Sequence, residues 1–158
     1  MSADRHGWNA LDHYIGIHDA HLNRFDHFIE TNGVTFTVAG PDSIRIAGRF
    51  SSVGGVYLDV SKILEINTRN QVRTLKYSNH AGITMPVLRS IFRYDNAHRY
   101  DRAGHADEHH KHVFDSSGQE AANPTWIGRD QWPTLGEVLE ELEEWWQETG
   151  RFEADSSP

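Results

Sequence analysis

The sequence predicts a single-domain α+β protein, an antiparallel β-meander sheet packed by a long N-terminal helix and a C-terminal helix. Near both ends of the chain, apolar residues recur at spacings of three and four, as they do on one face of a helix. Between these ends, short β-rich runs are separated by turn signals, with no helical pattern among them. Strands joined by short turns pair antiparallel, which is why we expect a meander.

The N-terminal helix is expected to run from about Trp8 to Thr31. Its apolar stripe consists of Trp8, Leu11, Ile15, His18, Leu22, Phe25 and Ile29. Asn32 and Gly33 suit the end of a helix, because both residues tolerate the left-handed backbone conformation. A stripe this narrow is typical of paired helices, so we predict a homodimer through this helix, with His18 near the seam. The simplest interpretation of His18 is a buried histidine with a polar partner.

Five strands are expected next, over residues 34–39, 43–50, 56–60, 72–77 and 87–95. The turn signal Gly40-Pro41-Asp42 joins the first two as a hairpin. The fourth strand is expected to end at Asn79-His80-Ala81-Gly82. In the last strand, alternation places Arg93 and Asp95 on the face opposite Phe92 and Tyr94.

The C-terminal helix is predicted by a capping box, Thr134-Leu135-Gly136-Glu137, which follows Pro133. Its apolar stripe contains Leu135, Val138, Leu139, Leu142, Trp145 and Trp146. The glutamates between these positions are interpreted as a solvated face. The domain is expected to cover residues 1–152, with a disordered tail over 153–158.

Composition limits the classes of protein that this sequence can represent. The chain of 158 residues contains no cysteine, which excludes disulfides and thiolate zinc sites. Its apolar runs are too short to span a bilayer, and residues 1–6 lack the apolar core of a secretory signal, so a cytoplasmic protein without a membrane contact is expected.

The charge is unevenly distributed along the chain. The formal net charge is -8, yet residues 85–115 contain five basic and five acidic side chains, so the whole excess lies outside this segment. The same segment holds His98, His105, His109, His110 and His112, five of the 11 histidines. An anionic partner would therefore bind here, and we expect a small molecule or a flexible single strand, because the remaining surface repels duplex nucleic acid.

Acid–base chemistry is one interpretation of this segment. If residues 109–112 form a strand, His110 and His112 share one face, and His109 and Lys111 share the other. Two imidazoles with pKa values of ~6.5 can supply a base and an acid at neutral pH, which is what metal-independent RNA cleavage requires. Arg93 and Lys111 are candidates for phosphate contact, and Asp95 for orienting a histidine.

Two other interpretations remain open. The segment can be a polar connection whose histidines lie at a sheet edge without any chemistry. Alternatively, His105 and His109, or His109 and His112, bind zinc or nickel together with His98 or Asp107 and leave one position open for water. In that case the protein is a non-enzymatic, histidine-rich module that binds a metal or a protein partner.

Three blocks of sequence resemble the TumE-type toxin family. They are Arg93-Tyr94-Asp95-Asn96-Ala97, His109-His110-Lys111-His112 after a histidine-rich loop, and Pro133-Thr134-Leu135 at the start of the final helix. The resemblance covers roughly residues 43–146. The sequence departs from the family where Arg99-Tyr100-Asp101 and Ala106-Asp107-Glu108 stand in place of further histidines and a Phe-Pro pair.

The resemblance implies a toxin of a toxin–antitoxin operon, paired with a helix-turn-helix antitoxin and acting on RNA. Together with the residues above, it favours a metal-independent ribonuclease of single-stranded RNA that needs no cofactor. His110 and His112 are the expected acid–base residues. Arg93 and Lys111 are expected to contact phosphate, and Asp95 to orient the site.

Overall fold

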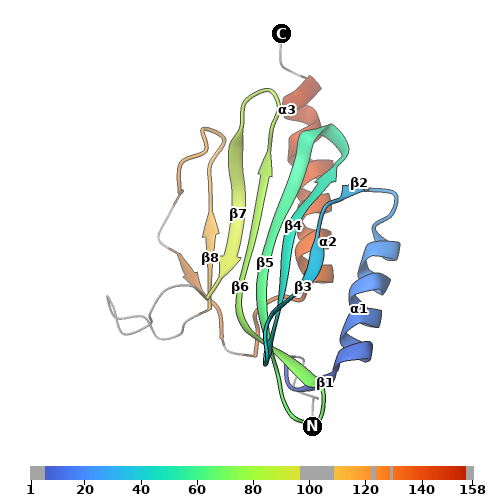
Figure 1. Cartoon of the computed structure of the whole chain (residues 1–158). Coiled ribbons are helices and arrows are strands. Elements are labelled where there is room, and N and C mark those ends of the chain that lie inside the picture. Colours follow the sequence, from blue (N-terminus) through green and yellow to red (C-terminus); the bar gives the residue numbers. More distant parts are fainter. Residues whose placement is uncertain (1–5, 97–108, 122–123, 129, 156–158) are drawn as a thin grey trace.

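The sheet dominates the fold, and the predicted α+β class is confirmed. The computed structural model describes residues 6–96, 109–121, 124–128 and 130–155, and within these it forms a nine-stranded antiparallel sheet (Figure 1). The strands are β1 Asn9–Ala10, β2 Ile29–Asn32, β3 Thr35–Gly40, β4 Ser43–Ser52, β5 Val56–Ile66, β6 Gln71–Ile83, β7 Arg89–Asp95, β8 His110–Val113 and β9 Thr125–Trp126. The spatial order is β2-β4-β5-β6-β7-β8-β9, while β1 pairs with β6 and β3 with β4.

Helices α1 (Leu11–Arg24) and α2 (Leu135–Trp145) pack on one face of this sheet, where the core lies. A π-helical turn, η2 (Trp146–Gly150), joins α2 to α3 (Arg151–Asp155), and a 3₁₀ turn, η1 (Val53–Gly55), joins β4 to β5. Fully buried side chains from both layers meet in this core: Phe28, Phe50, Leu58, Leu64, Leu139 and Leu142. The opposite face of the sheet carries the polar residues described below.

Helix α2 forms as the capping box predicts. The Thr134 hydroxyl accepts a hydrogen bond from the Glu137 backbone N–H at 3.3 Å, which satisfies one of the donors that a helix start leaves unpaired. Its predicted apolar stripe is buried from Leu135 to Leu142. Residues 153–155, which we placed in a disordered tail, complete α3, and Glu153 forms an ion pair with Arg89.

The N-terminal helix is shorter than predicted. It ends at Arg24, and residues 29–32 form strand β2, which pairs with the end of β4 so that Ile29 lies opposite Ser52. Pairing along β4 satisfies backbone groups that this strand would otherwise leave open, and such long-range pairing overrides a helical spacing of side chains. Gly33 does mark a boundary, but it is the boundary between β2 and β3.

The apolar stripe of α1 packs against the chain's own core. Leu11 and Leu22 are partly buried there and Phe25 is fully enclosed, whereas Trp8 and Ile15 remain 38% and 37% exposed. Most of the stripe that suggested a homodimer is therefore already covered, and the homodimer stays a prediction.

Strand β6 extends through the residues that we interpreted as its end. Asn79 is fully buried between Val60 and Tyr94, and His80 lies between Asp59 and Arg93 on the neighbouring strands. Small and polar residues at 79–82 resemble a turn in sequence, but in the middle of a wide sheet they leave space for larger neighbours. At Gly82, an added Cβ would lie 2.3 Å from the Tyr57 ring.

His18 should make folding stability sensitive to mild acid. It is buried edge-on against Phe36, and burial, followed by the charge of Lys62, lowers its pKa to about 4. Because the unfolded chain takes up this proton near the ordinary value of 6.5, the contribution of neutral His18 is complete above that pH and is lost on the way down to pH 4. We expect wild type to lose on the order of 1–2 kcal/mol more than His18→Leu between pH 7 and 5 in urea unfolding. Equal losses in the two proteins would contradict a neutral, buried His18.

Candidate functional site

Strands β7 and β8 bring the two central sequence blocks together. Their antiparallel register places Asp95 opposite His110 and Arg93 opposite His112. Since directly opposed residues share a face, these four side chains lie on the sheet face away from the helices. Alternation, which the sequence indicated, places Arg93 with Asp95 and His110 with His112, and the register of the two strands brings both pairs to one face.

Asp95 is the centre of the cluster. Its Oδ1 lies 2.8 Å from His110 Nε2, and its Oδ2 accepts a hydrogen bond from Arg93 Nε at 2.7 Å. His112 Nε2 is 3.8 Å from the same Oδ2. Asp95 is only 2% exposed, His110 0% and His112 6%, so the basic side chains offset the cost of removing a carboxylate from water.

Two residues outside the predicted segment complete this cluster. Glu120 Oε1 lies 2.6 Å from His112 Nδ1 and fixes the ring from the solvent side. Trp126 stands opposite His110 across the β8–β9 pair, and the centres of their rings are 5.3 Å apart. Neither residue belongs to a recognisable motif, so no signal in the sequence connected them to the site.

The structure places Lys111 apart from His110 and His112. Its ammonium group pairs with Glu141 of α2, on the helix-covered face, and lies 5.1 Å from the centre of the Tyr94 ring. The Tyr94 hydroxyl also donates to Glu141, at 2.8 Å, and burial followed by this carboxylate raises the pKa of Tyr94. Lys111 thus connects the sheet to α2 instead of facing the histidines.

The alternative metal ligands do not assemble as the sequence suggested. His98 and His105 lie outside the described residues, and His109 is buried among aromatic rings, with Nδ1 3.0 Å from the Tyr77 hydroxyl. Within the described ranges, a different group of residues is close enough together to bind a metal ion. Ligand atoms of Asp95, His110 and His112 all lie within 4.8 Å of one another. Two imidazoles and a carboxylate are ligands that zinc accepts.

A row of polar residues crosses five strands through this cluster. It consists of Arg49 on β4, Asp59 on β5, His80 on β6, Arg93 on β7 and His112 on β8, each directly opposite the next. We call it the polar row. Arg49 and Asp59 form one end of the polar row. Arg49 donates two hydrogen bonds to the Asp59 carboxylate, at 2.7 and 2.9 Å, so the charges of this pair are matched to each other.

His80, like Arg49 and Asp59, belongs to the polar row but is not among the site residues that the sequence predicts. It is half-buried, its Nε2 lies 2.7 Å from Ser90 Oγ, and burial, followed by the charge of Arg93, lowers its pKa. The sequence predicts the end of a strand at this residue, which lies outside residues 85–115. Extending the β6 alternation past Asn79 would have placed His80 beside Arg93, which was the available signal.

Comparison with known proteins identifies the family of this chain. The family model described as Toxin TumE matches residues 18–148, which is most of the chain and includes the whole polar row. No curated protein and no solved structure matches. Among the helices that the structure describes, none is long and apolar enough to cross a membrane.

Proposed function

The chain belongs to the TumE toxin family, and from this premise we propose that it is a toxin that cleaves single-stranded RNA without a metal ion. Membership of the family supports a toxin of a toxin–antitoxin system, with an antitoxin as its partner. The ribonuclease activity and the helix-turn-helix type of the antitoxin are our proposals. The observation that carries the activity is the position of Arg93 between His80 and His112 in the polar row.

The spacing of these three residues suits a phosphodiester. Neighbouring strands lie about 4.8 Å apart, so the backbones of His80 and His112 are separated by roughly 10 Å, with Arg93 between them. With the phosphate bound by the Arg93 guanidinium, the 2′-hydroxyl of the adjacent ribose would be directed toward one imidazole and the 5′-oxygen of the leaving nucleotide toward the other. Arg93 would also stabilise the charge that develops on the phosphate oxygens.

The proposed step needs one neutral and one protonated imidazole. His80 removes the 2′-hydroxyl proton, because its lowered pKa keeps the ring neutral at pH 7. The 2′-oxygen attacks phosphorus and the bond to the 5′-oxygen breaks, while His112 donates a proton to that leaving oxygen. The products are a 2′,3′-cyclic phosphate and a 5′-hydroxyl end.

The remaining members of the cluster are positioning residues in this proposal. His110 contacts Asp95, which also holds Arg93, so we assign His110 a positioning role through this carboxylate. Direct acid–base catalysis by His110, which the sequence suggested, stays a prediction. We assign Lys111 to fixing β8 against α2 through Glu141.

Controlled expression in a bacterial host tests the proposal. We expect growth arrest accompanied by new RNA ends that carry a 5′-hydroxyl, and recovery when the product of a neighbouring helix-turn-helix gene is expressed as well. Intact RNA during a clear arrest would contradict the ribonuclease and leave the toxin. An absence of arrest in several hosts would contradict both and favour a binding module.

A metal site is the second candidate, because three ligand groups already converge at Asp95, His110 and His112. Their chemistry fits zinc with one position open, but the ligand atoms would have to approach to about 3.3 Å from one another to surround an ion tetrahedrally at ~2.0–2.1 Å. Such a centre would also require Asp95 to share its carboxylate between the ion and Arg93.

We expect untagged protein purified with a chelator to contain no stoichiometric metal and to retain full RNA cleavage. Elemental analysis measures the first expectation and a gel assay the second. A His110→Asn variant serves as the matched control, since it removes one ligand of the group. About one zinc per chain in wild type, absent from this variant, together with activity lost on chelation, would replace the acid–base proposal by a metal centre.

A further inference from the structure

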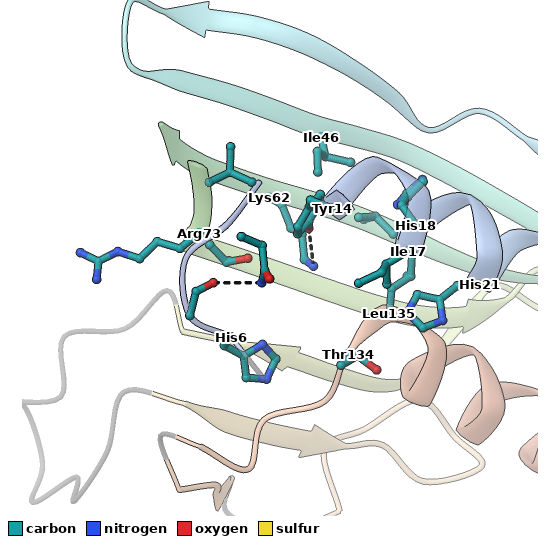
Figure 2. A pocket seen from close by; sticks show the side chains of 15 residues that line it. His6, Tyr14, Ile17, His18, His21, Ile46, Lys62, Arg73, Thr134 and Leu135 are labelled. Atoms are coloured by element: carbon teal, nitrogen blue, oxygen red, sulfur yellow. Dashed lines mark hydrogen bonds between the residues drawn. The ribbon is translucent and has the colours of Figure 1, made fainter. Parts of the chain in front are cut away.

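A second polar site lies on the other face of the sheet, under α1. Figure 2 shows a pocket between α1, strands β4 to β6 and the start of α2, with a volume of about 90 Å³. Ile46 and Val60 of the sheet, Ile17 of α1 and Leu135 of α2 provide apolar walls. Because the sheet separates this pocket from the polar row, the proposed RNA chemistry does not use it.

Lys62 places a positive charge inside these apolar walls. The residue is only 8% exposed, and its Nζ donates a hydrogen bond to the Tyr14 hydroxyl of α1 at 3.2 Å (Figure 2). In the part of the chain that the structure describes, Lys62 has no aspartate or glutamate partner. A neutral phenol offsets only part of the cost of burying an ammonium group, and an anion would offset more of it.

Two neighbouring histidines share this buried environment next to Lys62. His18 and His21 line the pocket, and burial, followed by the charge of Lys62, lowers the pKa of each. Asp19 acts in the opposite direction on His18. At neutral pH both rings are therefore uncharged and can present an N–H donor to an anion without adding a buried charge.

We propose that this pocket binds a small monocarboxylate. The carboxylate pairs with Lys62 and accepts the proton of the Tyr14 hydroxyl, while a short hydrocarbon chain packs against Ile17, Ile46 and Leu135. The volume favours a chain of a few carbons, because a cavity of ~150 Å³ already accommodates benzene. The apolar walls, which a hydrocarbon chain can cover, favour a carboxylate that carries such a chain over an inorganic phosphate.

Binding would link the two layers of the fold. Tyr14 and Ile17 belong to α1, Lys62 and Ile46 to the sheet, and Leu135 to α2. An occupant that contacts all three stabilises the folded chain by mass action, so its binding appears as a rise in the unfolding temperature.

Thermal unfolding of the full chain with sodium butyrate tests the proposal. Sodium chloride at the same concentration controls for ionic strength, and butyramide controls for the hydrocarbon chain without the charge. We expect butyrate to raise the Tm in a saturable manner by several degrees, with little or no shift from either control. No shift at tens of millimolar butyrate, or an equal shift from butyramide, would overturn the proposal.

Two lysine variants locate the site. Lys62→Met keeps an unbranched side chain that is one atom shorter and removes the charge, whereas Lys76→Met removes an exposed charge elsewhere in the sheet. The butyrate shift should disappear in the first and persist in the second. If Lys62→Met does not fold, Tyr14→Phe replaces it, and its shift should be reduced. A full butyrate shift in Lys62→Met, or in Tyr14→Phe, would place the anion elsewhere and overturn the proposal.

Discussion

Replacing His112 by asparagine should lower RNA cleavage by about 10²–10⁴-fold, the usual contribution of a group that transfers a proton in the rate-limiting step. Asparagine retains a polar group near Glu120, which contacts His112 Nδ1, but it cannot donate or accept the proton of the reaction. His80→Asn should produce a loss of similar size, because the mechanism uses both rings. Cleavage of a labelled single-stranded RNA by purified protein measures both effects.

His13→Asn is the matched control, since His13 is exposed on α1, far along the chain from the polar row. Circular dichroism of each variant separates lost chemistry from lost folding. If His80→Asn retains full activity while His112→Asn is inactive, Arg93 does not lie between two catalytic imidazoles, and the base must be sought elsewhere in the cluster. Full activity of both variants would remove the acid–base proposal.

Replacing Asp95 by alanine should cost about 3–5 kcal/mol of folding stability and abolish activity, because it leaves buried basic groups without their carboxylate. His110 is fully buried and contacts Asp95 at 2.8 Å, and Arg93 donates to it at 2.7 Å. Asp95→Asn keeps an oxygen that can accept one of these hydrogen bonds, so its loss of stability should be smaller, about 1–3 kcal/mol. Urea unfolding measures both changes.

Asp26→Asn provides the control for a lost carboxylate, because Asp26 is exposed and lies in the turn after α1. It should change the free energy of unfolding by less than about 0.5 kcal/mol. A stable Asp95→Ala variant would mean that His110 and Arg93 find other partners, and Asp95 would no longer be the centre of the site. The sequence predicts only that Asp95 orients the site. Its contacts in the structure make its replacement the change with the largest expected loss of folding stability.

Local patterns predicted most of the fold, and they predicted four residues of the site, Arg93, Asp95, His110 and His112. The capping box at Thr134 defines a helix start through one side chain and one backbone donor three residues later, so short-range information is sufficient. Alternation likewise groups Arg93 with Asp95 on β7 and His110 with His112 on β8, whereas the register of the pair, which local patterns do not give, brings the two groups to one face.

The predictions from sequence fail where contacts between residues far apart in the chain determine the secondary structure. The helical spacing of apolar residues continues past Arg24, so no local signal marks the end of the helix. Residues 29–32 form a strand because they pair with the end of β4, which lies more than twenty residues after Arg24 in the chain. Likewise, His80 belongs to the polar row only because β6 continues between β5 and β7. Glu120 contacts His112, and Trp126 contacts His110 from the neighbouring strand β9. The spacing of residues in the sequence does not predict either contact.

The alternation of β8 also restricts how this gene can vary in length. His110 and His112 face the polar row, while Lys111 between them faces Glu141 of α2. A deletion or insertion of a single codon within the strand would exchange the two faces, moving the imidazoles under the helix and the ammonium onto the row. Homologues should therefore reject insertions and deletions between residues 110 and 113.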